Sequence, residues 1–307
     1  MENNYSIVVD SISRVFGVNT VIDDLSFKVL KGSVHGFLGP NGAGKTTTMK
    51  MIMDILPPSK GNISIHAESV GALLEIAPLF EDMIVEDYLV YVCKLQRVSP
   101  SKIKLFVEEA ITKLNLKDVE KRLIRNLSKG YKQRVAVAQA IVFKPEIIIL
   151  DEPTVGLDPA SVIEMRNLIS KIGKDHTVLI SSHLLHEIEV LCDHITIIKN
   201  GKLVISDTVE QIKKHASAEV SLRIECLNEE EAFEASIKEA IELSSNLKRI
   251  EKENENNIVY RVFFDGAIKS RLQIYDLVKR SNLEVLEFSI EESNLEQSFL
   301  SLLGERE

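Results

Sequence analysis

Cysteine is scarce in this sequence, because only Cys93, Cys192 and Cys226 occur and they lie far apart. Their spacing matches neither a disulfide framework nor a metal site, so buried thiols in a reducing compartment are expected. No apolar run approaches the roughly 18 residues of a membrane-spanning helix. Residues 1–5 are polar and acidic, which predicts that no signal peptide is present. These absences predict a cytoplasmic chain that reaches a membrane only through a partner.

An excess of positive charge is also absent, since 37 lysines and arginines stand against 46 acidic residues. Nucleic-acid binders usually carry a basic surface for the phosphate backbone, so nucleic acid is not expected as a partner. No internal repeat and no long linker is apparent. The length of 307 residues allows one large and one small domain.

Glycine is concentrated in residues 39–47, where the pattern G-x-x-x-x-G-K-T has every fixed position filled. Residues 34–38 before it are typical of a buried strand. Residues 47–56 after it are typical of a helix that Pro57 stops. This context favours a phosphate-binding loop over a chance glycine-rich turn. The residues that we expect to bind the phosphates are Gly39, Pro40, Asn41, Gly42, Ala43, Gly44, Lys45, Thr46 and Thr47.

The chemistry of this loop follows from its residue types. Backbone N–H groups of the curled loop and the positive end of the helix point at anionic oxygens. Lys45 reaches the β- and γ-phosphates, and the Thr46 hydroxyl can ligate Mg²⁺. The sequence therefore predicts a site for a nucleoside triphosphate and Mg²⁺.

A second phosphate-type element lies at residues 145–153, an apolar run that ends in Asp151 and Glu152. Such a run is typical of a central strand in a parallel sheet, whose carboxyl end faces the ligand crevice. Asp151 is then placed to hold Mg²⁺, directly or through water. Glu152 is placed to orient or deprotonate an attacking water. The alternative, a pair of solvated turn acids, is disfavoured by the phosphate loop in the same chain.

The remaining pattern surrounds these two elements. Residues 5–34 alternate like an antiparallel layer, and Phe16 in it is either a core aromatic or a ring that stacks on adenine. Residues 85–126 have helical periodicity, and the predicted helical insertion covers about residues 76–140. Residues 177–183 resemble another buried strand, and His183 at its end is by itself typical of a surface or capping residue.

The order of these motifs, together with residues 127–134, Leu-Ser-Lys-Gly-Tyr-Lys-Gln-Arg, resembles the ATP-binding subunits of ABC transporters. The resemblance covers about residues 5–215 and is greatest to exporter-type subunits with an appended C-terminal domain, including antibiotic-resistance and peptide-immunity exporters. It implies a P-loop ABC ATPase fold, α/β with a parallel-sheet core, an antiparallel layer and a helical insertion.

The resemblance also implies roles for single residues. Ser128 and Gly130 belong to the signature sequence, which faces the γ-phosphate held by a second copy. Lys129 and Tyr131 depart from the usual Leu-Ser-Gly-Gly-Gln. Asp158 belongs to the loop that crosses the dimer seam. Two further matches are His183 to the switch histidine and Phe16 to the adenine-stacking aromatic.

One departure concerns the metal. The strand at residues 69–75 ends in Glu75, where the family usually has a glutamine that ligates Mg²⁺ and senses the membrane partner. A carboxylate is also a suitable Mg²⁺ ligand, although it adds negative charge near the triphosphate. Glu75 is therefore a candidate ligand beside Thr46 and Asp151.

The resemblance implies an Mg²⁺-dependent ATPase that dimerises around two ATP molecules and drives a separately encoded transmembrane permease. That permease would hold the chain at the cytoplasmic face of the membrane. Leu79, Phe80 and Tyr88 are candidates for the permease groove, or equally for plain core of the insertion. The competing class is a soluble ABC-type ATPase with a non-membrane partner. That class usually has two nucleotide domains or a basic or coiled-coil insertion, and neither is apparent.

Beyond residue 215 the pattern is strand, helix, strand, strand, helix, strand and a last helix at 295–303. This order predicts a small α+β, ferredoxin-like domain at 216–307 with no chemistry of its own. Its expected role is contact between subunits, or alternatively cover for an apolar patch of the ATPase domain. The apolar residues expected on one face of its sheet are Leu222, Ile224, Val259, Val262, Val285 and Phe288.

Overall fold

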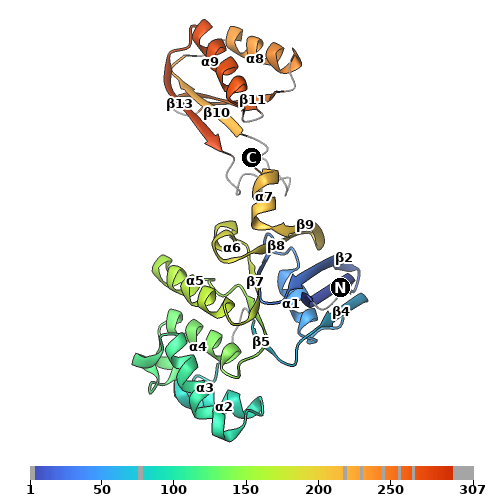
Figure 1. Cartoon of the computed structure of the whole chain (residues 1–307), viewed down its shortest axis with the longest axis vertical. Coiled ribbons are helices and arrows are strands. Elements are labelled where there is room, and N and C mark those ends of the chain that lie inside the picture. Colours follow the sequence, from blue (N-terminus) through green and yellow to red (C-terminus); the bar gives the residue numbers. More distant parts are fainter. Residues whose placement is uncertain are drawn as a thin grey trace. The chain divides into compact units, whose positions relative to one another are not determined.

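The computed structural model describes residues 4–74, 79–216, 220–228, 231–243, 246–254, 257–264 and 267–292. The chain divides into two compact units, residues 1–209 and 210–307 (Figure 1). The domain boundary expected after His215 falls within α7 (Val209–Ala216). No helix in the described ranges is long and apolar enough to cross a membrane.

Unit 1 is built on a six-stranded sheet with the order β5-β6-β7-β3-β8-β9. The first five strands are parallel, and β9 pairs antiparallel with β8. Every residue of β3, β6 and β7 is buried, as their continuous apolar runs predict. The predicted parallel core is thus confirmed. Its strands are β3 (Val34–Leu38), β5 (Val70–Leu73), β6 (Ile147–Asp151), β7 (Thr177–Ser182), β8 (His194–Lys199) and β9 (Lys202–Thr208).

The expected antiparallel layer is also present. It comprises β1 (Tyr5–Phe16), β2 (Asn19–Leu30) and β4 (Lys60–Ile65) in the order β2-β1-β4. Its inward side chains share one buried apolar cluster with α1 (Lys45–Ile52) and the central strands. Phe27 and Phe37 from these two sheets lie with ring centroids 5.0 Å apart. This core holds β3 and α1 rigidly, and with them the loop between them.

Within the residues that the structure describes, three helices form the predicted insertion, and they gather at one end of unit 1 (Figure 1). They are α2 (Val85–Leu95), α3 (Pro100–Lys113) and α4 (Lys129–Ile141), with the short 3₁₀ turns η2 (Lys117–Val119) and η3 (Ile124–Asn126) between the last two. Two more helices follow strands of the main sheet, α5 (Pro159–Gly173) after β6 and α6 (Leu185–Leu191) after β7.

One expectation for unit 1 was wrong, and for Tyr88, which could belong to the permease groove or to the core, the structure supports the core. The helix after the glycine loop ends at Ile52 rather than at residue 56, because Asp54 takes a left-handed φ of 56° before the prolines. Tyr88 is only 2% exposed and donates its hydroxyl proton to Gln139, so it belongs to the core of the insertion. Burial, with the nearby Tyr91, raises the pKa of Tyr88 to about 12. Phe80 is 51% exposed and remains a surface residue.

Unit 2 has the predicted order of elements. They are β10 (Val220–Cys226), α8 (Glu231–Leu243), β11 (Leu247–Asn254), β12 (Ile258–Phe264), α9 (Ile268–Arg280) and β13 (Val285–Glu292). The strands form an antiparallel sheet in the order β11-β12-β10-β13, which is a ferredoxin-like arrangement. The predicted last helix at 295–303 lies outside the described residues.

The core of unit 2 lies between this sheet and α8 and α9. Leu222 and Ile224 of β10 are fully buried in it, with Val262 of β12. Val285 and Phe288 pack against it, as expected. Val259 is buried but is not part of this cluster, so its predicted place on that face was wrong. The reason is the period of two along a strand, which puts Val259 and Val262 on opposite faces.

We predict that unit 1 folds without unit 2. A chain that ends at Ala216, the last residue of α7, is expected to be soluble, to melt in one cooperative transition and to bind ATP with the affinity of the full chain. Each unit has its own buried cluster, which is the physical basis of this expectation. Calorimetry and an ATP titration on both lengths provide the test. Loss of ATP binding in a well-folded short chain would contradict it.

Candidate functional site

The glycine loop connects the fully buried strand β3 to the start of α1. Gly44 caps α1 with a φ of 104°, a region that residues with a Cβ rarely adopt. A Cβ at Gly39 would lie 2.5 Å from the carbonyl oxygen of Ile198, so the backbone passes too close there for any larger residue. The loop therefore has the curled backbone that the glycine pattern predicts.

Lys45 lies inside this loop and is only 7% exposed. Its Nζ donates to the carbonyl oxygens of Gly39, at 2.8 Å, and Pro40, at 3.2 Å. The same Nζ is 3.2 Å from Oε1 of Glu152. The ammonium group is thus held at the mouth of the loop by oxygen atoms on two sides.

Glu152 contacts two other sequence-predicted residues, Lys45 and His183, so that the three form one cluster. Its Oε1 faces Lys45, and its Oε2 lies 2.9 Å from Nδ1 of His183. The Glu152 side chain is 9% exposed, whereas that of His183 is 35% exposed. The structure therefore brings the loop lysine, the strand-end carboxylate and the histidine together, although they are far apart in the sequence.

Asp151, the residue before Glu152, is completely buried. Its Oδ1 accepts a 2.5 Å hydrogen bond from the Ser181 hydroxyl, and that same hydroxyl accepts from the backbone N–H of Glu152 at 2.9 Å. Sequence reasoning missed Ser181, whose only signal is its place at the polar end of an apolar strand. Oδ2 of Asp151 is buried and has no hydrogen-bond partner among the described residues.

This second carboxylate oxygen bears on the predicted metal. A buried acceptor without a partner suits a metal ion or one of its water ligands. Thr46 lines the same pocket. Glu75, the third predicted ligand, lies outside the described residues. In the described ranges no group of three His, Cys, Asp or Glu side chains could hold a metal ion alone. The fit is thus to Mg²⁺ that takes its other ligands from phosphate and water.

The cluster opens into a pocket of about 480 Å³. Val21 and Val155 also line it, and nothing in the sequence pattern identified them. Phe16 is not part of the lining; it lies at the end of β1 with 45% exposure. The guanidinium carbon of Arg14 lies 4.6 Å from the centroid of the Phe16 ring. The lining residues from the predicted set are Asn41, Gly42, Gly44, Lys45, Thr46, Thr47, Glu152 and His183.

The signature residues do not line this pocket. Ser128 caps α4, where its Oγ accepts from the N–H of Tyr131 at 3.4 Å. Asp158 caps α5 by accepting from the N–H and the hydroxyl of Ser161, which hold the pKa of the Asp158 carboxyl below its usual value. A Cβ at Gly130 would lie 3.1 Å from that hydroxyl. The two helix starts are therefore neighbours, and neither contributes a residue to the lining of the loop pocket.

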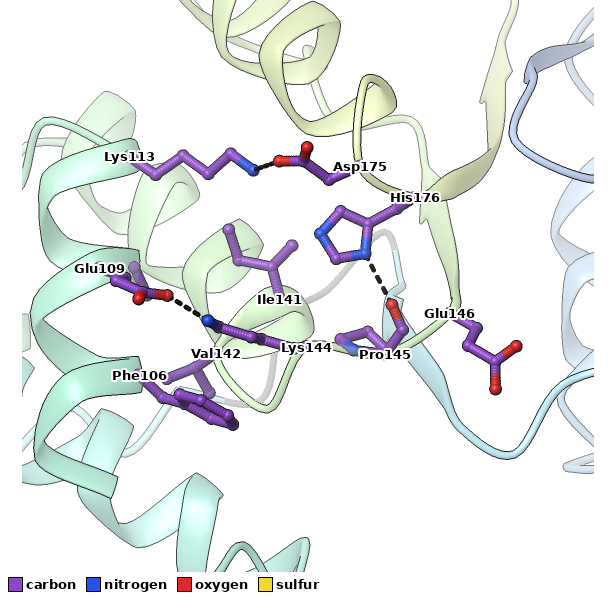
Figure 2. A pocket seen from close by; sticks show the side chains of 11 residues that line it. Phe106, Glu109, Lys113, Ile141, Val142, Lys144, Pro145, Glu146, Asp175 and His176 are labelled. Atoms are coloured by element: carbon purple, nitrogen blue, oxygen red, sulfur yellow. Dashed lines mark hydrogen bonds and ion pairs between the residues drawn. The ribbon is translucent and has the colours of Figure 1, made fainter. Parts of the chain in front are cut away.

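A second cavity, of about 370 Å³, lies between α3, the end of α4 and the turn before β7 (Figure 2). Its charged side chains pair with one another, Lys113 with Asp175 at 2.6 Å and Lys144 with Glu109 at 2.5 Å. Nδ1 of His176 lies 2.6 Å from the Pro145 carbonyl oxygen, and burial lowers the pKa of His176. These pairs link the insertion to the main sheet, and the cavity has none of the phosphate-binding features of the loop pocket.

A strand, a curled glycine loop with a buried lysine, and a strand-end acid pair beside a histidine define a P-loop nucleoside triphosphatase. The sequence profile of the ABC transporter family matches residues 22–155. With a relative that is 30% identical over nearly the whole length, this match shows that the chain belongs to the ABC transporter ATP-binding proteins. It is an ATPase subunit that powers such a transporter.

That relative is the bacitracin transport ATP-binding protein BcrA of Bacillus licheniformis, aligned over 95% of each chain. The lantibiotic transport ATP-binding protein SrtF of Streptococcus pyogenes is 32% identical over 64% of this chain and 88% of its own. A solved structure, described as the ATP-binding subunit of an ABC transporter, matches with a TM-score of 0.62 at 26% identity. It covers 68% of this chain and 92% of its own. The predicted ABC ATPase fold is therefore confirmed.

We predict that Lys45→Ala weakens ATP binding about 10- to 100-fold, because a hydrogen bond to a charged group contributes roughly 1.5–3 kcal/mol. Lys50→Ala is the matched control, since Lys50 lies on the same helix but outside the pocket lining. Equilibrium titration with a fluorescent ATP analogue measures both. Equal affinities for the two variants and the wild type would contradict the assignment of Lys45.

Proposed function

We propose that this chain works as an ATP-sandwiched homodimer that drives export through a separately encoded transmembrane subunit. The observation that supports this most is the division of the predicted residues between the pocket and two helix starts outside its lining. Lys45, Glu152 and His183 meet in one pocket, whereas Ser128 and Asp158 cap two helices outside it. A second copy can supply the surface that one chain does not bring to its own pocket.

Hydrolysis in this proposal uses the three clustered residues. A water adds to the γ-phosphorus, the bond to the bridging oxygen breaks, and ADP and phosphate leave. Glu152 takes the proton of the attacking water, which requires it to exchange its contact with Lys45 for one with water. Lys45 then turns to the phosphate oxygens, and His183 stabilises the charge that spreads over them.

The metal belongs to the same proposal. Thr46 and Asp151, with Glu75 as a further candidate, would hold Mg²⁺ beside the phosphates. When bound, the ion neutralises negative charge on the β- and γ-oxygens. The partnerless Oδ2 of Asp151 supports its role, because a buried carboxylate oxygen without a hydrogen bond is otherwise costly.

Two helix starts complete the site from the second copy. Ser128 and the Gly130 N–H offer hydrogen bonds and a positive helix end to the γ-phosphate. Asp158 lies beside them through Ser161 and would cross the seam between copies. Phe16 would stack on the adenine, and Arg14 supports its ring: the Arg14 guanidinium lies over the ring, and its Nη1 donates to the Pro57 carbonyl oxygen at 2.6 Å.

The membrane subunit contacts the insertion in this proposal. Phe80 is half exposed and packs edge-on against Tyr91, with ring centroids 5.4 Å apart, which gives an apolar surface for an incoming helix. The relatives named for bacitracin and lantibiotic transport support export of peptide antibiotics. Contact with such a permease would place the chain at the cytoplasmic face of the membrane.

We predict that Glu152→Gln retains ATP affinity but lowers turnover by about 10²-fold or more, since the amide keeps the shape and loses the base. It should also accumulate as a dimer in ATP, because unhydrolysed nucleotide continues to bridge two copies. Glu109→Gln, which removes a carboxylate from another ion pair, is the matched control. Steady-state hydrolysis and light scattering measure the two effects.

The same variant tests the transport proposal in cells. Deletion of the gene should increase sensitivity to bacitracin or a lantibiotic, and the wild type but not Glu152→Gln should restore resistance. Wild-type turnover by Glu152→Gln would contradict the role of Glu152. Unchanged sensitivity of the deletion strain to both kinds of antibiotic would contradict the cargo class and leave the ATPase assignment intact.

A further inference from the structure

The turn that follows β6 is strained and fixed at three consecutive residues. Glu152 has a φ of 50°, in the left-handed region that non-glycine residues rarely adopt. Its N–H donates to Ser181 Oγ at 2.9 Å, and the carbonyl oxygen of Pro153 accepts from Gln133 Nε2 at 2.9 Å. The Thr154 hydroxyl donates to Oε2 of Glu187 at 2.7 Å. A strained turn persists only where its surroundings hold it, and here β7, α4 and α6 each provide one anchor.

The anchor on α6 is unusual, because Glu187 is a carboxylate with only 3% exposure. Its Oε2 accepts a second hydrogen bond, at 3.1 Å, from the hydroxyl of Ser182. Both donors are neutral hydroxyls, and a buried carboxylate held in this way costs stability relative to an apolar residue. Glu187 is outside the lining of the loop pocket and has no part in the hydrolysis described above.

The two donors lie next to the two reacting side chains in the sequence, Thr154 in the turn after β6 and Ser182 at the end of β7. Thr154 is two residues beyond Glu152, and Ser182 directly precedes His183. Ser182 Oγ also accepts from the N–H of Leu184 at 3.0 Å, so the backbone is fixed on both sides of His183. One oxygen atom thus joins the turn that carries Glu152 to the end of β7 next to His183, the two residues that are themselves 2.9 Å apart.

We propose that Glu187 is a positioning residue that sets the separation of Glu152 and His183 by binding Thr154 and Ser182 together. The proposal rests on the proposed function, in which those two side chains act on the γ-phosphate. Misplacement of a reacting group by about 1 Å can cost 10²-fold in rate. Loss of this tie should therefore lower kcat and leave ATP affinity nearly unchanged, because the carbonyl oxygens of Gly39 and Pro40 still hold Lys45 in the loop.

The experiment uses the full chain with paired substitutions. Thr154→Val removes the hydroxyl at constant shape, and Thr154→Ser keeps it. Glu187→Ala removes the acceptor, and Glu187→Gln keeps a carbonyl oxygen that can accept both bonds, as Oε2 does now. Thr177→Val is the matched control, because Thr177 is also buried and hydrogen-bonded but lies at the opposite end of β7. Each protein is assayed for kcat at saturating ATP and Mg²⁺, for ATP affinity and for thermal stability.

We expect kcat to fall about 10- to 100-fold in Thr154→Val and Glu187→Ala, with rescue in Thr154→Ser and Glu187→Gln. Thr177→Val should lose stability while it keeps the wild-type kcat. If Thr154→Val behaves like Thr177→Val, Glu187 is only a structural anchor and the inference is wrong. Should Glu187→Ala fail to fold, the comparison of Thr154→Val with Thr154→Ser still tests the proposal. A wild type without ATPase activity would contradict the proposed function itself, which is a separate result.

Discussion

The Glu152 carboxylate is the point on which the site depends, because its two oxygens face Lys45 at 3.2 Å and His183 at 2.9 Å. To bring it there, the chain must leave the buried end of β6 through a left-handed residue while Asp151 stays in the core. The parallel sheet makes this arrangement feasible, since β3, β6 and β7 end at one edge. The insertion contributes through Gln133 of α4, which holds the same turn by the Pro153 carbonyl oxygen.

Much of this could be predicted because long apolar runs and fixed glycine spacings are local signals. The strands at 34–38 and 147–151 and the loop between β3 and α1 follow from them directly. Ser181 and Glu187 could not be found in this way, because a buried polar residue is recognised by its partners and these are distant in sequence. Tyr88 was ambiguous for a related reason, since helical periodicity does not show whether an apolar stripe faces its own core or a partner.

In unit 2 the sequence likewise predicts the elements but not which face of a strand each residue occupies. The order of its strands and helices is readable from alternation, and the antiparallel order β11-β12-β10-β13 agrees with it. The face of the sheet on which Val259 lies cannot be read from alternation, because a shift of one residue in phase exchanges the two faces of a strand. Its sheet has one face in the core with α8 and α9 and shows no cluster resembling the loop pocket among its described residues.

The central claim is that each nucleotide is held by the loop of one copy and the signature helix of another. Mixing two inactive variants tests it: Lys45→Ala damages the loop, and Ser128→Asp keeps a helix cap but repels phosphate. The account predicts little ATPase activity from either variant alone and clear recovery on mixing, since one intact composite site forms. A mixture of Lys45→Ala with Glu152→Gln, which damages the loop side of both sites, should not recover. Activity of the first mixture that stays at the sum of its parts would contradict the account.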